Sequence, residues 1–236
     1  MRRVLLGGLA AALLTACGPE DAQDTALKRM EFEVSQVRDA LRQEPDSPVL
    51  YYELSRVYRR YGLADSIRVA LEKSIALEPG FPQAQRELAQ LYFEAGDLAG
   101  AERCWSAVAL LSETDLEAWN NLGFVRRERG DLEGAAAAYL EALEIDSTFA
   151  QTLNNLAQVY RAQDRADEAE GLYHRAMVAD PTFRGAYINL ANLYREAADF
   201  DQERALLREV QQRFGHSSPE GRHATERLTE LASSGG

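Results

Sequence analysis

The chain has 236 residues, of which 46% are hydrophobic and 27% are charged, as in an ordinary folded globular protein. Its 38 acidic side chains outnumber its 26 basic ones and give a net charge of −12, which argues against a nucleic-acid backbone as the partner. With 7 prolines, long disordered stretches are not expected within the body of the chain.

The N-terminus has the pattern of a secretory signal. Arg2 and Arg3 precede an apolar run from Val4 to Leu14, which is too short to span a bilayer as a helix. The run leads into the tetrad Leu-Thr-Ala-Cys, which ends at Cys17 and resembles the lipobox of bacterial lipoproteins. The resemblance implies a lipoprotein signal peptide over residues 1–16 and attachment of lipid, palmitate included, to Cys17. An ordinary cleaved signal and an uncleaved anchor are the competing interpretations.

Loss of the signal would leave a net charge of −14, because Arg2 and Arg3 are removed with it. Residues 17–24 would then form the lipidated cysteine and a short polar tether, and two or more acyl chains give a stable membrane anchor. The resemblance implies a lipid-anchored protein of the bacterial cell envelope. Gly18 stands where an Asp favours the inner membrane in enteric bacteria, so we expect the periplasmic face of the outer membrane.

Residues 25–45 are expected to form an N-terminal capping helix. Apolar residues recur there at intervals of three and four and make one apolar stripe from Ala26 to Gln43. They are Leu27, Met30, Val34, Val37 and Leu41. Pro45 lies one 34-residue period before Pro79, so the segment corresponds to the second helix of a truncated first repeat.

A 34-residue repeat occupies residues 48–217. One apolar residue recurs at the same place in every copy: Leu54, Leu88, Leu122, Leu156 and Leu190. Steps of this length give five repeats: 48–81, 82–115, 116–149, 150–183 and 184–217. A repeat this short cannot bury its own hydrophobic face, so neighbouring copies must stack into one continuous core. The unbroken series predicts one elongated unit.

The third copy carries the clearest motif. It contains Trp119-Asn120-Asn121-Leu122-Gly123, followed by Ala135 and Tyr139. The pattern resembles the tetratricopeptide repeat, whose signature includes W-x-x-L-G and A-x-x-x-F. The resemblance implies an all-α solenoid of antiparallel helix pairs, wound as a right-handed superhelix. The first helix of each pair, called helix A below, would line a concave groove.

Three repeats have a glycine where helix A must end, because glycine adopts the left-handed conformation of a helix cap at little cost: Gly62, Gly96 and Gly130. Asp164 tolerates that conformation, whereas Ala198 predicts a different turn in the fifth repeat. Glu203 occupies a position that is alanine in repeats 2 to 4, which predicts a looser or solvent-exposed fifth repeat. Gly123 is expected to let helix A approach its partner helix closely.

The starts of the second helices and the end of the repeat array are also marked. Asp97 and Asp131 are suited to cap the helices that follow them. Residues 218–236 are expected to form a C-terminal capping helix and a tail, with Ser217 and Glu220 at the spacing of a capping box. Its apolar residues would cover the exposed end of the last repeat: Ala224, Leu228 and Leu231.

The groove-facing positions of helix A carry amide and guanidinium side chains. Stacked asparagines resemble the ladder with which some tetratricopeptide proteins hold a peptide backbone, while arginines suit carboxylates. The candidate binding residues are Arg56, Arg59, Asn120, Asn121, Phe124, Arg127, Asn154, Asn155, Gln158, Arg161, Asn189, Asn192 and Arg195. Local hydrogen bonding of the asparagines, and pairing of the arginines with Glu94, Glu128 and Glu196, are the structural alternatives.

No catalytic residue, metal ligand set or cofactor is expected. His174, His216 and His223 lack carboxylate or cysteine partners at useful spacing, and the chain has no phosphate-binding loop or nucleophile motif. Cys104 would have no intramolecular partner if Cys17 carries lipid, and a buried hydrophobic role is favoured over a reactive thiol.

The sequence therefore predicts a membrane-anchored scaffold for protein–protein interaction that binds an extended segment of another protein, acidic or ending in a C-terminal carboxylate. Assembly of a cell-envelope complex, of the pilus or secretin kind, is suggested by family analogy alone. No nucleic acid or small-molecule substrate is expected. The alternatives are a structural subunit that binds by its convex face, and an accessory or regulatory subunit of an envelope enzyme.

Overall fold

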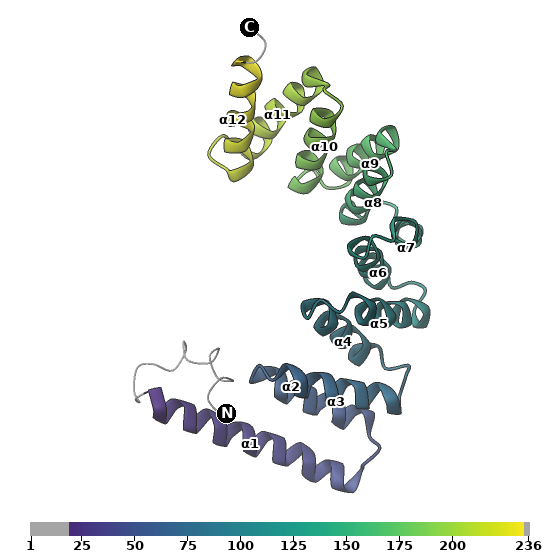
Figure 1. The fold of residues 1–236 in the computed structure, drawn as a ribbon, viewed down its shortest axis with the longest axis vertical. Coiled ribbons are helices and arrows are strands. Elements are labelled where there is room, and N and C mark those ends of the chain that lie inside the picture. The colour runs from purple at the N-terminus through teal and green to yellow at the C-terminus, as the bar shows by residue number, and fades with distance from the viewer. Residues whose placement is uncertain (1–18, 234–236) are drawn as a thin grey trace. The chain divides into compact units, whose positions relative to one another are not determined.

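The computed structural model describes residues 19–233, and these residues form α-helices joined by short connections (Figure 1). The first five helices are α1 (Pro19–Gln43), α2 (Pro48–Arg60), α3 (Ala64–Leu77), α4 (Pro82–Glu94) and α5 (Leu98–Leu111). The others are α6 (Leu116–Glu128), α7 (Leu132–Ile145), α8 (Ala150–Ala162), α9 (Ala166–Ala179), α10 (Arg184–Glu196), α11 (Phe200–Phe214) and α12 (Pro219–Ser233). The expected all-α class is confirmed.

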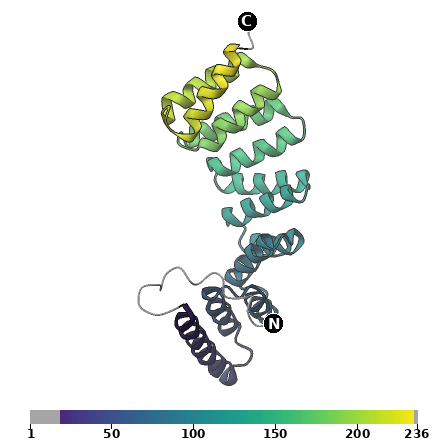
Figure 2. The ribbon, with the colours of Figure 1, turned by 60° about the vertical axis from the view of Figure 1, so that its left-hand side comes forward.

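The chain divides into two compact units, one up to Glu113 and one from Thr114, where the sequence predicts a single unbroken array. In unit 1, α1 packs on α2, and the pairs α2–α3 and α4–α5 are joined through α3 and α4. In unit 2, the pairs α6–α7, α8–α9 and α10–α11 stack in order, and α12 packs on α11 (Figure 2). The boundary lies in the connection after repeat 2, which has Asp115. The connections after repeats 1, 3 and 4 have a phenylalanine at the same position: Phe81, Phe149 and Phe183.

Each helix pair consists of a helix A (α2, α4, α6, α8 and α10) and a helix B (α3, α5, α7, α9 and α11). In unit 1, Val34 of α1 is buried with Leu54 and Val57 of α2, so α1 covers the first full pair as a capping helix should. In unit 2, one core runs from Ala135 of α7 to Leu231 of α12. The core of unit 2 is therefore continuous through its adjacent pairs.

All five turns from helix A to helix B contain a left-handed residue. The φ angles are +68° at Gly62, +78° at Gly96, +83° at Gly130, +60° at Asp164 and +57° at Ala198. The expectation of a different turn at Ala198 is wrong. Its amide donates to the carbonyl of Arg195 at 3.1 Å, and the amide of Asp199 donates to that of Tyr194 at 2.9 Å, as in the glycine-containing turns. The hydrogen bonds and packing of the pair impose the turn on an unfavourable residue.

Aspartate side chains cap several helices B, as the sequence predicts. Asp97 accepts a hydrogen bond from the Gly100 amide at 2.8 Å, and Asp131 accepts one from the Gly134 amide at 2.9 Å. At α12 the predicted cap is off by one residue. Ser218, not Ser217, accepts from the Gly221 amide at 2.9 Å, because the helix starts immediately after it at Pro219.

Helices A and B approach closely at Gly123. A methyl group added at this glycine would lie 2.7 Å from the ring of Tyr139 on α7, well inside van der Waals contact. Tyr139 is fully buried. The small residue after the central leucine thus makes room for the aromatic ring of helix B, as the repeat pattern predicts.

Two further expectations are corrected. Helix α1 begins at Pro19, so the polar segment up to Asp24 that was expected to be a tether is largely helical. The polar residues after Pro19 include no helix breaker, and proline is favoured in a first turn.

Glu203 is 2% exposed rather than facing solvent, because Arg227 of α12 binds its carboxylate. Ala224 and Leu231 of α12 are buried against the last pair, so its capping role is confirmed.

The signal peptide and Cys17 lie outside the described residues. Within residues 19–233, no helix has the length and apolar character needed to cross a bilayer.

Candidate functional site

The predicted groove residues lie on the helices A of both units, and each unit presents its own set. Arg56 and Arg59 are on α2 of unit 1. The others are on α6, α8 and α10 of unit 2. We call the latter side chains, other than the buried asparagines, the helix-A surface of unit 2: Asn121, Phe124, Arg127, Gln158, Arg161, Asn189, Asn192 and Arg195.

In unit 1, the arginines face carboxylates of the same unit. Glu53, Arg56, Arg59, Arg60 and Glu87 line a polar hollow on α2 and α4. The Arg59 guanidinium lies 3.0 Å from a Glu87 oxygen, and Arg56 lies 2.9 Å from Glu53. Arg60 pairs with Glu33 of α1 at 2.9 Å. The positive charge of this surface is therefore balanced within unit 1.

Glu87 also binds a tyrosine. The hydroxyl of Tyr52 donates to the Glu87 carboxylate at 2.6 Å. Partial burial, and then this carboxylate, raise the pKa of Tyr52 to about 12, so the hydroxyl stays protonated and remains a donor. The bond joins α2 to α4, the two helices A of unit 1.

In unit 2, the asparagines bond to one another across successive helices A. The Asn155 amide donates to the Asn120 carbonyl at 3.4 Å, and the Asn189 amide donates to the Asn154 carbonyl at 2.8 Å. Thr152 also donates to Asn120, at 2.9 Å. Asn120, Asn154 and Asn155 are buried, whereas Asn189 is half-buried. These amides thus connect α6 to α8 and α8 to α10.

The hydrogen bonds between neighbouring helices A join the same pair of repeat positions in both units. Tyr52 and Glu87, Asn120 and Asn155, and Asn154 and Asn189 are each 35 residues apart. Repetition of the sequence thus repeats a polar bond between neighbouring helices A. The sequence indicated the asparagine positions but not these hydrogen bonds. The repeat is 34 residues long, so a spacing of 35 residues joins two different positions of the repeat, and a comparison of equivalent positions does not pair them.

The arginines of unit 2 contact both neutral groups and carboxylates. Arg127 donates to the Gln158 carbonyl oxygen at 3.0 Å and stacks on Phe124, with 5.0 Å between the guanidinium carbon and the ring centroid. It also pairs with its sequence neighbour Glu128 at 2.9 Å. Arg195 donates to the Asn192 carbonyl oxygen at 2.8 Å. These contacts orient the guanidinium groups, and the pairing of Arg127 with Glu128 that the sequence suggested as an alternative to ligand binding is present.

Arg161 differs because it pairs with a carboxylate on the next helix A. Its guanidinium lies 2.9 Å from an oxygen of Glu196 on α10. The Glu196 side chain is half exposed, so the pair is a solvated one and contributes little to stability. The pairing with Glu196 that the sequence suggested as an alternative to ligand binding is therefore present.

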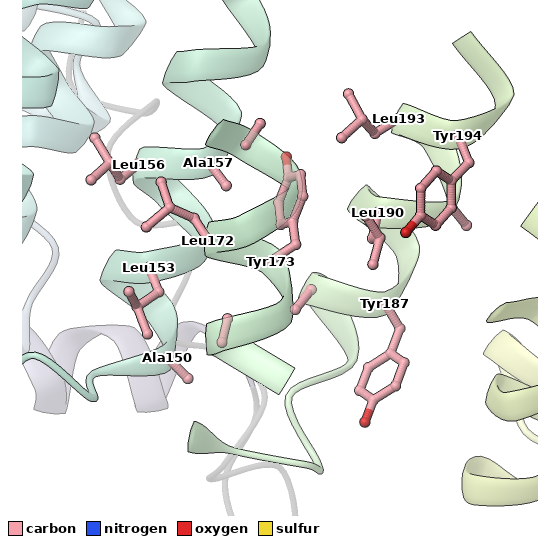
Figure 3. Close-up of a cluster of buried hydrophobic side chains, with 14 of the residues drawn as sticks. Ala150, Leu153, Leu156, Ala157, Leu172, Tyr173, Tyr187, Leu190, Leu193 and Tyr194 are labelled. Atoms are coloured by element: carbon pink, nitrogen blue, oxygen red, sulfur yellow. The ribbon is translucent and has the colours of Figure 1, made fainter. Parts of the chain in front are cut away.

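Two buried tyrosine hydroxyls, of Tyr139 on α7 and Tyr173 on α9, were not predicted as part of a site from the sequence. Both residues are fully buried, and within the part of the chain that the structure describes neither hydroxyl has a hydrogen-bond partner. Figure 3 shows Tyr173 between Leu156 and Ala157 of α8 and Leu190 of α10. A buried hydroxyl without a partner loses its bonds to water, so it is a place where a new bond can form.

Two effects of opposite sign act on the pKa of each of these hydroxyls. Burial raises the pKa of Tyr173, and the Arg161 guanidinium opposes that rise. Burial also raises the pKa of Tyr139, and Arg127 opposes it there. The tyrosine and arginine recur together one period apart, at Tyr139 with Arg127 and at Tyr173 with Arg161. Repeats 3 and 4 thus present the same arrangement.

Cys104 belongs to unit 1. It is a free, buried cysteine on α5. Burial raises the pKa of its thiol to about 11, which keeps it protonated and unreactive at neutral pH. The expected packing role is confirmed.

Comparison with known proteins supports the repeat assignment. Residues 125–164 match the model of a TPR repeat, and residues 152–185 match that of a tetratricopeptide repeat. No curated protein matches the sequence.

Solved structures share the fold at low sequence identity. A crystal structure of MamA protein has a TM-score of 0.66 at 20% identity, covering 72% of this chain and 92% of its own. The crystal structure of YrrB, described as a TPR protein with an unusual peptide-binding site, has a TM-score of 0.60 at 18% identity, covering 69% and 84%. The chain therefore carries tetratricopeptide repeats, and its antiparallel helix pairs have the all-α solenoid fold of such proteins.

Proposed function

We propose that the protein is a lipid-anchored scaffold of the bacterial cell envelope that binds an extended, acidic segment of a partner protein on the helix-A surface of unit 2. One observation carries the binding surface. Arg127, Arg161 and Arg195 recur on three successive helices A of an acidic protein, and Arg127 and Arg195 are oriented by neutral carbonyl oxygens. The carboxylates that pair with Arg127 and Arg161, those of Glu128 and Glu196, are about half exposed, so these pairs are weak. Guanidinium groups held in this way are suited to bind carboxylates.

The similarity to YrrB supports a peptide as ligand, because that tetratricopeptide structure is described as having a peptide-binding site. Helix A presents amide side chains beside the arginines, and carboxamides pair with peptide groups regardless of the partner's side chains. Unit 1 is a poorer surface for an acidic segment, because the carboxylate that pairs with Arg59 is more buried: the Glu87 side chain is 25% exposed, against 50% for Glu196 in unit 2.

Envelope attachment rests on the N-terminal sequence. The basic start, the apolar run and the tetrad that ends at Cys17 resemble a lipoprotein signal, and the body would then be held at the membrane by acyl chains. Growth with an alkyne analogue of palmitate should label the wild type and the Cys104→Ser variant, while Cys17→Ser should carry no label. An unlabelled wild type would refute the anchor.

Site-specific photo-crosslinking tests the binding surface in cells. Lys28 and Lys73 are the only lysines of the chain, so amine-reactive reagents would sample two points and miss the helix-A surface of unit 2. A photoreactive amino acid at Gln158, which is half-buried on α8, should capture the partner. The same amino acid at Gly171, exposed on α9 with open space around it, serves as the matched control.

The second candidate is a structural subunit that binds through its helices B. Val178 on α9 is 81% exposed and Leu140 on α7 is 47% exposed, which leaves apolar area on these helices. Capture from Gly171 but not from Gln158 would favour this alternative and contradict binding on the helix-A surface of unit 2.

A further inference from the structure

Unit 2 has a hollow of about 430 Å³ beside α9, at the connection between α7 and α8. Its lining residues come from the connection, from α8 and from the second half of α9: Ser147, Thr148, Leu153, His174, Arg175, Val178 and Ala179. Val178 is 81% exposed, so the hollow opens to solvent. None of the predicted groove residues lines it, so it is separate from the helix-A surface of unit 2.

The repeat itself shows which kind of side chain fits this hollow. Leu153 stands at a position that is aromatic in three other copies: Tyr51 in repeat 1, Trp119 in repeat 3 and Tyr187 in repeat 5. Leu153 is 1% exposed and forms the inner wall of the hollow. Because leucine is shorter than an aromatic side chain, repeat 4 leaves open the space that the outer part of a ring fills in those copies.

A cation lies over the tyrosine ring in two of those copies. The Lys73 ammonium is 5.8 Å from the ring centroid of Tyr51 in repeat 1, and the Arg213 guanidinium carbon is 5.5 Å from that of Tyr187 in repeat 5. Arg175 corresponds to Lys73, three periods further along the chain. Within residues 19–233 no carboxylate pairs with Arg175. Repeat 4 therefore has the cation of this arrangement but not the ring.

A backbone carbonyl completes the arrangement. In repeat 5 the Tyr187 hydroxyl donates to the Pro181 carbonyl at 3.4 Å. The corresponding carbonyl in repeat 4 is that of Ser147, and Leu153 has no donor to offer it. Arg175 donates to this carbonyl instead, at 3.1 Å. This bond holds the guanidinium at the hollow, and the second lone pair of the carbonyl can still accept a hydroxyl.

We propose that the hollow binds a tyrosine side chain from an exposed segment of a partner protein, in the place that Tyr187 fills within repeat 5. The ring packs on Leu153 and turns one face toward Arg175, because the electron-rich face of an aromatic ring attracts a guanidinium. The hydroxyl of the ligand donates to the Ser147 carbonyl. This site does not depend on the binding of an acidic segment to the helix-A surface of unit 2.

Saturation-transfer NMR with short peptides tests the class of ligand. The probes are three capped peptides of the sequence Gly-Ser-X-Ser-Gly, in which X is tyrosine, phenylalanine or leucine. The tyrosine peptide should bind the whole protein about two- to tenfold more tightly than the phenylalanine peptide, because it adds one hydrogen bond. The leucine peptide should bind least, because it has no ring to face the guanidinium.

Two outcomes of this titration would overturn the proposal. One is equal affinity of the tyrosine and leucine peptides, or no binding of the tyrosine peptide at millimolar concentration. The other is binding of free tyrosine without binding of the tyrosine peptide, which would mean that the hollow takes an amino acid rather than a protein segment.

Leu153→Tyr is the blocking variant. The new side chain should fill the hollow as Tyr187 does in repeat 5, so the tyrosine peptide should no longer bind, while the unfolding midpoint should not fall. Unchanged affinity for the peptide in a folded Leu153→Tyr protein would show that the peptide binds elsewhere and would overturn the site.

Arg175→Gln tests the cation without changing the buried wall, because Arg175 is exposed. It should weaken binding of the tyrosine peptide several-fold, whereas Arg175→Lys should retain most of the affinity, since Lys73 has this role in repeat 1. Arg208→Gln, at an exposed arginine of α11, is the matched control for the change in charge. Equal effects of Arg175→Gln and Arg208→Gln would refute the proposal. Gln158 lies outside the hollow, so partner capture there still tests the proposed function by itself.

Discussion

Arg227 binds both carboxylate oxygens of Glu203, at 2.7 and 3.1 Å, across the contact between α11 and α12. Glu203 is 2% exposed and stands where repeats 2 to 4 have Ala101, Ala135 and Ala169. Arg227 also pairs with Glu230 at 3.0 Å. A charged residue in the small apolar position is thus matched by a residue of the capping helix, and the pair helps to fix α12 on the last repeat.

Removal of Arg227 should be strongly destabilising. Arg227→Ala leaves the Glu203 carboxylate buried without its partner, and breaking a buried pair in this way costs about 3–5 kcal/mol. Urea unfolding followed by circular dichroism measures the loss. Arg208→Ala, an exposed arginine on α11, should change stability by less than about 0.5 kcal/mol. A double replacement of Glu203 and Arg227 by leucine should recover most of the lost stability. An equal loss of unfolding free energy in Arg208→Ala and Arg227→Ala would contradict the structure.

Ala198→Gly should stabilise the protein. Ala198 has a φ of +57°, a conformation that costs a non-glycine residue about 1–2 kcal/mol, part of which glycine avoids. Ala197, the preceding residue, has a φ of −76° and provides the control, since glycine there should cost about 0.5–1 kcal/mol. Opposite shifts of the unfolding midpoint are expected from the two variants. Two shifts of the same sign would show that Ala198 is not held left-handed.

Two glycines in different helix pairs, on α6 and α9, should respond oppositely to alanine. In Gly123→Ala the new methyl group would meet the Tyr139 ring at 2.7 Å, and overpacking of this kind costs about 1–3 kcal/mol. In Gly171→Ala the methyl group meets nothing within 4 Å on an exposed helix, so stability should rise by about 0.5–1 kcal/mol. Thermal unfolding of the two variants distinguishes close packing of α6 on α7 from a loose fit.

Cys104 should react with iodoacetamide only when the protein unfolds. Its buried thiol has a pKa of about 11, so at pH 8 little thiolate is present, and the fraction rises only as pH approaches that value. Mass spectrometry of the Cys17→Ser variant, in which Cys104 is the remaining cysteine, measures the labelling. Slow labelling in buffer and rapid labelling in denaturant are expected. Rapid labelling in buffer at pH 8 would mean that Cys104 is exposed and reactive.

The repeat period and the packing positions could be predicted from the sequence because each is fixed by local chemistry. Gly62, Gly96 and Gly130 identify the turns, and Gly123 identifies the close approach to Tyr139. These residues carry out their roles within one repeat or between adjacent helices. A single sequence is sufficient to recognise such positions when they recur every 34 residues.

The errors came from residues whose role depends on a neighbouring element. Ala198 is left-handed because the hydrogen bonds of the turn hold it there, against its own preference. Glu203 is buried because Arg227, on another helix, supplies the opposite charge. Propensity and position in the repeat describe neither effect, since both arise from tertiary context.

The candidate site shows the same limit. The asparagine positions were found from the repeat, but the bonds of Asn120 to Asn155 and of Asn154 to Asn189 were not, because each joins two repeat positions. This bonding changes how the site should be tested. Replacing Asn155 would leave buried polar groups without partners at a cost of about 1–3 kcal/mol, so the half-buried or exposed arginines are cleaner choices for binding variants.

The most direct measurement is co-purification of the partner from solubilised envelopes with a double variant, Arg127→Ala/Arg161→Ala, and a control of equal charge, Arg208→Ala/Arg222→Ala. Both control arginines are exposed, on α11 and α12. The account predicts that the first variant loses the partner while its unfolding midpoint stays close to that of the wild type, and that the control retains the partner. Equal recovery of the partner with all three proteins would contradict binding on the helix-A surface of unit 2.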